Sequence, residues 1–247
     1  MLAIAQQDFF EQALDLIQRG SYRQAVPLLI KAAESGNEPQ AAFFLSQAYR
    51  GENGLERNDS LTDVWLLRAA SGGYTPAFPG AASILLNNRS AFFDSIAGVH
   101  MLRTCANQKQ AHCQLALSRI FLTHKNKRGA LDSALVLLKS LGAGTSLTDN
   151  GELLCRQDAI ETLIDLYENP SSKIFDEITA CAWFLIWTAN MELSQPANKE
   201  LYFTRGKKLC VKLSAAKIEK ARLLAENIIK DKIVMPEGLP AGKGSKP

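Results

Sequence analysis

Three histidines and five cysteines are the side chains of this 247-residue sequence that are best suited to bind a metal or to act as nucleophiles. His100, His112 and His124 follow one another at intervals of 12 residues, and the sequence has no His-x3-His face and no Cys-x2-Cys pair for zinc. Cys113 adjoins His112, but neighbouring helix residues point about 100° apart and cannot form a nucleophile–base pair with each other. G-x-S-x-G, H-E-x-x-H and P-loop motifs are also absent from the sequence. We therefore expect no metal, no cofactor and no enzymatic activity.

Basic residues are concentrated near the end of the chain. The segment 199–232 has ten basic and four acidic residues, whereas the whole sequence has a net charge of only +3. Lys207, Lys208 and Lys212 are the candidate residues of a basic surface. Two interpretations stay open, a solvated helix face or an electrostatic docking surface for an acidic protein, a membrane or nucleic acid. Nucleic acid is not the favoured partner.

Apolar residues recur at helical spacing along nearly the whole chain, and strand-like alternation never persists. Residues 8–19 have one apolar side and are followed by Gly20, whose missing Cβ suits a left-handed helix cap. Ser21 then caps a second helix that ends at Gly36, so a helix pair fills the first 36 residues. The pattern predicts an all-α protein.

The helix pair repeats along the sequence. A basic residue late in the second helix occurs at Lys31, Arg68, Arg103 and Lys139, at spacings of 37, 35 and 36 residues. A period of this length is typical of solenoids, in which each pair buries its apolar face only by stacking on its neighbours. Small residues such as Ala41 are expected where the stacked helices approach closely.

The second repeat carries a more specific signature. In order, it contains Ala41-x3-Leu45-x3-Tyr49, Gly54-Leu55, Asn58-Asp59, Trp65, Arg68-Ala69-Ala70 and Gly72. This pattern resembles the Sel-1-like repeat, a relative of the tetratricopeptide repeat, although Ser46 replaces a glycine of the family pattern. The resemblance is strongest over 41–73 and extends over about 8–230. It implies an α-solenoid of about six stacked helix pairs in a right-handed superhelix, and a bacterial adaptor or scaffold for protein–protein interaction.

The resemblance also implies where a partner binds. First-helix positions that packing leaves free line a concave groove, and such grooves bind a peptide or a helix. The candidate partner-binding residues are Phe43, Phe44, Gln47, Arg50, Gln114 and Ser118. An alternative function comes from cysteine-rich relatives described as binding or hydrolysing β-lactam-like compounds. Trp65 and Trp183 are expected in the core, whereas burial and exposure both stay open for Trp187.

The five cysteines fall into two groups. Cys105 and Cys113 lie at the end of one helix and the start of the next, and in a secreted branch of the Sel-1-like family this C-x7-C spacing forms disulfides. The resemblance thus implies a bridge worth about 2.5 kcal/mol, with two buried thiols in a reducing cytoplasm as the alternative. Cys155, Cys181 and Cys210 lie at helical core positions, so we expect them to be buried thiols.

Turn-forming residues set the expected boundaries. Residues 142–151 interrupt the repeat period, which predicts a long loop that can hinge two halves of a repeat domain over 1–232. The Pro- and Gly-rich tail 233–247 is expected to be disordered. No apolar run approaches the roughly 18 to 20 residues of a membrane span, and the N-terminus lacks the regions of a signal peptide. We expect a cytoplasmic protein, with a periplasmic or secreted protein that has lost its leader as the alternative, and leave the oligomeric state open.

Overall fold

The computed structural model describes residues 2–35, 38–51, 55–124, 127–144, 150–190, 199–236 and 238–239. These residues form twelve α-helices and one short 3-10 helix, with no strand among them, which confirms the predicted all-α fold. The helices are α1 (Leu2–Gln18), α2 (Tyr22–Ser35), α3 (Pro39–Ala48), α4 (Asp59–Ser71), η1 (Thr75–Ala77), α5 (Phe78–Leu86), α6 (Ser95–Asn107), α7 (Ala111–Thr123), α8 (Ala130–Gly142), α9 (Asn150–Glu168), α10 (Glu177–Asn190), α11 (Lys199–Val211) and α12 (Ala215–Ile229).

The chain forms two compact units, Met1–Gln108 and Lys109–Pro247, which we call unit 1 and unit 2. The boundary between them lies between α6 and α7, whereas the sequence predicts one repeat domain with a hinge at 142–151. Within that predicted hinge, 145–149 lie outside the described residues. The helices on either side of it, α8 and α9, belong to unit 2 and pack against each other.

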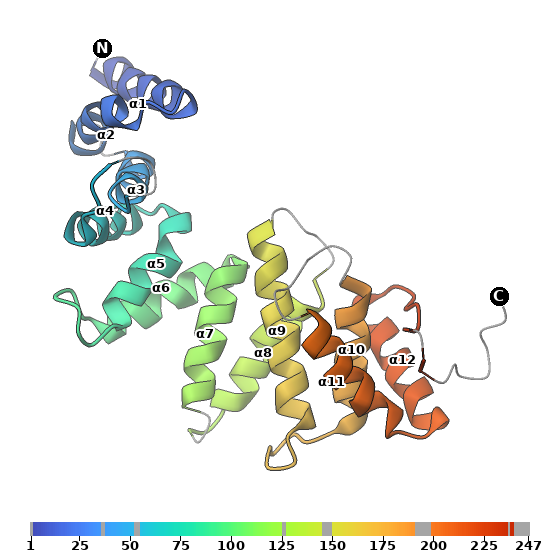
Figure 1. The fold of residues 1–247 in the computed structure, drawn as a ribbon. Coiled ribbons are helices and arrows are strands. Elements are labelled where there is room, and N and C mark those ends of the chain that lie inside the picture. The colour runs from blue at the N-terminus through green and yellow to red at the C-terminus, as the bar shows by residue number, and fades with distance from the viewer. Residues whose placement is uncertain are drawn as a thin grey trace. The chain divides into compact units, whose positions relative to one another are not determined.

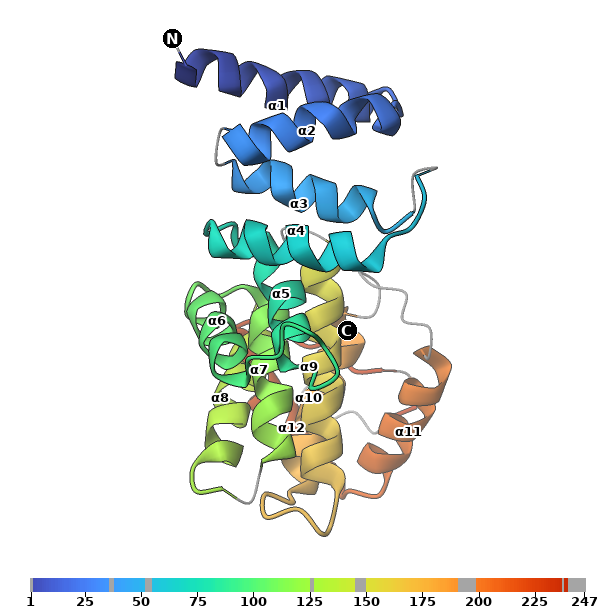
Figure 2. The ribbon, with the colours of Figure 1, turned by 90° about the vertical axis from the view of Figure 1, so that its left-hand side faces the viewer.

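In unit 1 each helix packs against the next one along the chain, and α1 to α4 lie one above another (Figure 2). The layers approach closely because alanines fill the contacts: Ala32, Ala33, Ala41 and Ala69 are all buried. Gly72 follows the same rule, since a Cβ at this position would lie only 2.6 Å from Cγ of Pro39. Larger side chains at these points would separate the layers.

The basic residue that marks the repeat has a structural role. The ammonium group of Lys31 lies 5.3 Å from the ring centroid of Phe9. Lys139 lies 5.5 Å from the ring centroid of Tyr167 in the same way. Arg68 packs over the ring of Trp65 and donates a hydrogen bond of 3.1 Å to the Ala33 carbonyl at the end of the preceding repeat. A cation over an aromatic face is favourable, which accounts for the basic position at these three sites.

In unit 2 the core is built around α10, which packs against α9, α11 and α12 (Figure 1). Every residue from Ala180 to Trp187 is buried, because a helix covered on all sides carries apolar side chains all round. Trp65 and Trp183 are buried as expected, and Trp187 is only 1% exposed. Of the two possibilities that the sequence leaves for Trp187, the structure therefore shows burial. Its indole N–H donates a hydrogen bond of 3.1 Å to Oε1 of Glu161.

The start of the predicted disordered tail packs against unit 2. Ile233 and Leu239 are buried in the core cluster, and Met235 packs against it. The backbone N–H of Ile233 also donates to Oε1 of Glu226 at 3.1 Å. The expectation of disorder is therefore wrong for these residues, because three apolar side chains in a Pro- and Gly-rich stretch find a surface to cover. Residues 237 and 240–247 lie outside the described residues.

Candidate functional site

Aromatic side chains form a row along the first-helix layer of unit 1. Phe10 of α1 lies 6.0 Å from Phe44 of α3, Phe44 lies 6.4 Å from Phe43, and Phe43 lies 5.2 Å from Tyr74, all between ring centroids. Phe43, Phe44 and Tyr74 are half-buried, and burial raises the pKa of the Tyr74 hydroxyl above its ordinary value. We call Phe10, Phe43, Phe44 and Tyr74 the aromatic row. It combines packing between successive repeats with partly accessible aromatic surface.

Two predicted polar residues flank this row. Gln47 lies three and four residues after Phe44 and Phe43, which places it on the same face of α3, and its side chain is exposed. Arg50 follows the end of α3 and is also exposed. Four of the predicted groove residues therefore lie together, on one helix and the turn that follows it.

The two predicted groove residues of unit 2 are not accessible. Gln114 is 7% exposed and Ser118 is fully buried, and the Ser118 hydroxyl donates to the Leu115 carbonyl at 2.7 Å. The prediction of a partner-binding surface at these positions is wrong. The reason is that α7 packs against both α8 and α9, so a face that would be free in a simple helix pair is covered.

The basic residues of α11 and α12 divide into paired and unpaired groups. Arg205 bridges to Asp165 and Glu168 of α9, and Arg222 bridges to Glu219 and Glu226. The hydrogen bond from Arg222 lowers the pKa of Glu219. Of the three predicted surface lysines, Lys208 and Lys212 are exposed and Lys207 is half-buried, and none makes an ion pair with another described residue. The basic surface is thus narrower than the count of basic residues suggests.

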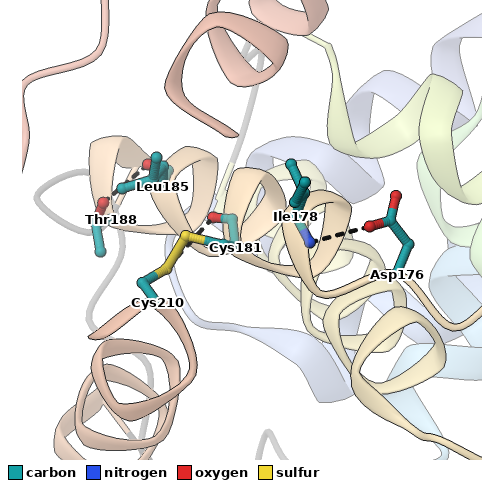
Figure 3. Close-up of a disulfide and its surroundings, with 6 residues drawn as sticks. All are labelled: Asp176, Ile178, Cys181, Leu185, Thr188 and Cys210. Atoms are coloured by element: carbon teal, nitrogen blue, oxygen red, sulfur yellow. Dashed lines mark hydrogen bonds between the residues drawn. A yellow bond between two sulfur atoms is a disulfide. The ribbon is translucent and has the colours of Figure 1, made fainter. Parts of the chain in front are cut away.

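A disulfide joins Cys181 of α10 to Cys210 of α11, where the sequence predicts two buried thiols (Figure 3). The two Cα atoms are 5.4 Å apart, within the range that a disulfide spans. The position of Cys181 is set by the start of α10, where the carboxylate of Asp176 accepts hydrogen bonds from the Ile178 N–H and the Thr179 hydroxyl. No local pattern could reveal this pair, because its members are 29 residues apart and meet only after the helices pack.

The other cysteines differ in state. Cys105 and Cys113 are both disulfide-bonded, the state that the resemblance implies for the C-x7-C segment. Cys155 is a buried thiol. Four of the five cysteines are therefore oxidised in this structure.

The side chains that suggested chemistry are dispersed. Within the part of the chain that the structure describes, no three His, Cys, Asp or Glu residues form a group suited to a metal ion, and His100, His112 and His124 are all exposed. The sequence also contains Ser214-Ala-Ala-Lys217, the S-x-x-K spacing of serine acyl-enzymes. Both of its residues are exposed at the start of α12, and the Ser214 side chain makes no capping hydrogen bond.

Two loops share a residue spacing and a set of hydrogen bonds that the sequence analysis did not identify. Each has the spacing Asn-x2-Ser-x2-Phe-Asp, over 87–94 before α6 and over 169–176 before α10. In each loop the Asn side chain accepts a bond from the backbone two residues later, and the final Asp caps the next helix. The phenylalanines are left exposed, by 51% for Phe93 and 44% for Phe175. The same spacing occurs twice, 82 residues apart, and this repetition is the sequence signal that identifies the two loops.

No helix among the described residues combines the length and the apolar character needed to cross a membrane. No protein-family model and no curated protein matches the sequence.

Solved structures do match. A protective antigen of uropathogenic Escherichia coli strains, displaying an SLR fold, superposes with a TM-score of 0.65 at 20% identity over 94% of this chain. This chain spans 46% of the length of that antigen. A Sel1 repeat protein from Oxalobacter formigenes matches with a TM-score of 0.46 at 18% identity, over 93% of this chain and 99% of its own length. The superposition on the antigen, together with the repeated helix pairs of each unit, shows that this chain has the Sel1-like repeat (SLR) fold.

Proposed function

We propose that this protein is a non-enzymatic scaffold that binds another protein through the first-helix face of unit 1. The observation that supports it is the aromatic row with its exposed neighbours Gln47 and Arg50. Aromatic residues and arginine are enriched in the energetically dominant parts of protein interfaces. The fold adds support, because stacked helix pairs present extended surfaces to peptides and helices.

The chemistry of this face indicates the kind of partner it takes. Phe43 and Tyr74 offer half-buried rings to an apolar side chain, while Gln47 and Arg50 offer hydrogen bonds at the edge. Phe44 contributes mainly to packing, because its ring is held against Phe10 of the preceding repeat. The partner is therefore a peptide or helix that inserts an apolar residue between polar ones.

Photo-crosslinking tests this proposal. The photoreactive residue p-benzoylphenylalanine is placed at Gln47 in the protein produced in its native host, and at Ser60, an exposed position on α4, as the control. We expect a crosslinked partner from position 47 and none from position 60. Adding Phe43→Ala should reduce capture about tenfold, because truncating an interface aromatic typically costs more than about 1 kcal/mol.

One pattern of results would contradict the groove and favour the basic surface instead. Capture would then survive Phe43→Ala, disappear with Lys208→Glu and Lys212→Glu, and weaken steeply between low and physiological salt. Equal crosslinking from positions 47 and 60 would also exclude a specific site on α3.

We also propose that the protein works in an oxidising compartment, the periplasm or the outside of the cell. The support is that four of its five cysteines are disulfide-bonded, and such bonds persist mainly outside the cytoplasm. Mass spectrometry of protein taken from its native host and alkylated without reduction tests this. We expect alkylation of denatured protein at Cys155 alone, whereas free alkylation of Cys181 and Cys210 would place the protein in a reducing compartment.

A further inference from the structure

The turn from α11 to α12 carries a concentrated positive charge. Residues 206–225 include six basic side chains and only one acidic side chain, Glu219. Four of the basic side chains are exposed lysines, and we call them the lysine patch: Lys208, Lys212, Lys217 and Lys220. They follow one another over the end of α11, the turn and the first half of α12. This continuity keeps the four charges on one part of unit 2.

The other side of the turn is anchored in the core of unit 2. Both helices pack on α10 (Figure 1), and Cys210, Leu213 and Ile218 are buried. Cys210 is also bonded to Cys181. Two backbone hydrogen bonds close the turn, from the Leu213 N–H to the Cys210 carbonyl at 2.9 Å and from the Ile218 N–H to the Ser214 carbonyl at 3.0 Å. Because the buried side chains face the core, the lysine patch is held on the exposed side.

The charges of the lysine patch are not neutralised within the protein. None of its four ammonium groups makes an ion pair with another residue of the described part of the chain. The carboxylates nearby are bound by arginines instead: Arg222 binds Glu219 and Glu226, and Arg205 binds two carboxylates of α9. Unpaired like charges on one surface raise the local positive potential, which attracts an anionic surface.

The composition of this surface distinguishes among anionic partners. Residues 208–223 contain no aromatic side chain, and their one arginine, Arg222, is bound internally. Arginine forks and aromatic rings are the groups that typically recognise an acidic protein or a nucleic acid. Lysine is instead a point charge on a flexible stem, and clusters of lysines near a membrane surface are typical of binding to anionic lipids.

Apolar side chains are interspersed with the lysines. Val211 lies beside Lys212 and is 53% exposed, and Leu223 lies three residues after Lys220 and is 52% exposed. Helices that bind at a bilayer surface combine lysines with apolar side chains that enter the head-group region. We propose that the lysine patch docks this protein on the surface of a bilayer that contains anionic lipids. The patch is in unit 2 and the aromatic row is in unit 1, so the inference does not depend on the proposed function.

Co-sedimentation of the full chain with lipid vesicles tests the inference. One set of vesicles is phosphatidylcholine alone, and the other contains about 30% phosphatidylglycerol as the anionic lipid. We expect the protein to bind the anionic vesicles and not the vesicles of phosphatidylcholine alone. Binding should weaken severalfold when sodium chloride is raised from about 0.05 M to about 0.15 M, because salt screens exposed charges.

Matched variants separate the patch from the net charge of the protein. The double variant Lys212→Gln, Lys217→Gln should bind the anionic vesicles about twentyfold more weakly, since each lysine near an anionic surface contributes roughly fivefold. Lys127→Gln, Lys173→Gln is the control, because it removes the same charge from two exposed lysines of unit 2 outside the patch, and it should bind almost as the parent protein does. All four positions are exposed, so circular dichroism should show unchanged helical content in both variants.

The apolar contribution has its own pair of variants. Val211→Ser should weaken binding to the anionic vesicles severalfold, because it removes an apolar side chain that enters the head-group region. Val136→Ser is the control, since Val136 is 68% exposed on α8 and lies outside the patch, and it should leave binding unchanged.

Competition distinguishes the bilayer from other anionic partners. A glutamate-rich peptide or a DNA duplex, added at the same concentration of negative charge as the lipid, should not release the protein from the anionic vesicles. Release by the peptide would assign the patch to an acidic protein, and release by the duplex would assign it to nucleic acid. The inference is also overturned if anionic vesicles are not bound, if phosphatidylcholine alone binds as well, or if the two double lysine variants bind with the same affinity.

Discussion

Replacing Gly206 with leucine is expected to destabilise unit 2 by about 3 kcal/mol or more. Gly206 is buried on α11, and a Cβ at this position would overlap the ring of Phe184 on α10. The Phe184 ring cannot move away from such a Cβ, because other rings pack against it. Its centroid lies 6.3 Å from that of Trp187, on which it is stacked, and 6.1 Å from that of Phe203. Overpacking a dense core forces strained rotamers or shifts the backbone, and here it would push α11 away from α10.

Urea unfolding followed by circular dichroism measures this effect. Thr204→Leu is the matched control, because Thr204 is an exposed residue of the same helix, and it should change the free energy of unfolding by less than about 0.5 kcal/mol. Gly206→Ala should fall between the two. Equal stability of Gly206→Leu and Thr204→Leu would mean that α11 does not dock on Phe184 as described.

Removing the disulfide between α10 and α11 is expected to have the second large effect. The double variant Cys181→Ala, Cys210→Ala should lose about 3.5 kcal/mol of stability, since a bridge over 29 residues restricts the unfolded chain by about this amount in the chain-entropy model. Both cysteines are fully buried, so the loss of their side-chain contacts adds to the cost. The measurement is the midpoint of urea unfolding, compared with that of the parent protein.

Two controls show that the bridge itself is responsible. Cys155→Ala removes a buried thiol without breaking a disulfide and should cost less than the double variant. Adding a reductant should lower the stability of the parent protein by more than that of the double variant, in which only Cys105 and Cys113 stay disulfide-bonded. A parent protein whose unfolding midpoint is the same with and without reductant would contradict the stabilising role of the disulfides.

Both predictions concern the attachment of α11, which three kinds of contact hold in place. The disulfide and the Gly206 contact join it to α10, and the ion pairs of Arg205 join it to α9. Lys208 and Lys212 lie on and just after this helix, on its exposed side. A docked α11 therefore fixes where the basic surface is, whichever surface binds the partner.

The sequence by itself determined the all-α class, the period of the repeat and the small residues between layers. These are local or periodic properties: helical spacing of apolar residues follows from 3.6 residues per turn, and alanine recurs wherever one layer meets the next. It also grouped Phe43, Phe44, Gln47 and Arg50, which lie within eight positions on one helix and the turn that follows it, whereas their role in binding a partner stays a prediction.

Only the tertiary structure decided the features that depend on helices far apart in the sequence. Cys181 meets Cys210 because α11 docks on α10, and Ser118 is buried because α7 also packs against α9. Arg156 is buried with its Nε–H donating to the Gly142 carbonyl at the end of α8, a contact that no spacing on α9 records. Burial and pairing are properties of the assembled core, and one helix pattern is compatible with several such assemblies.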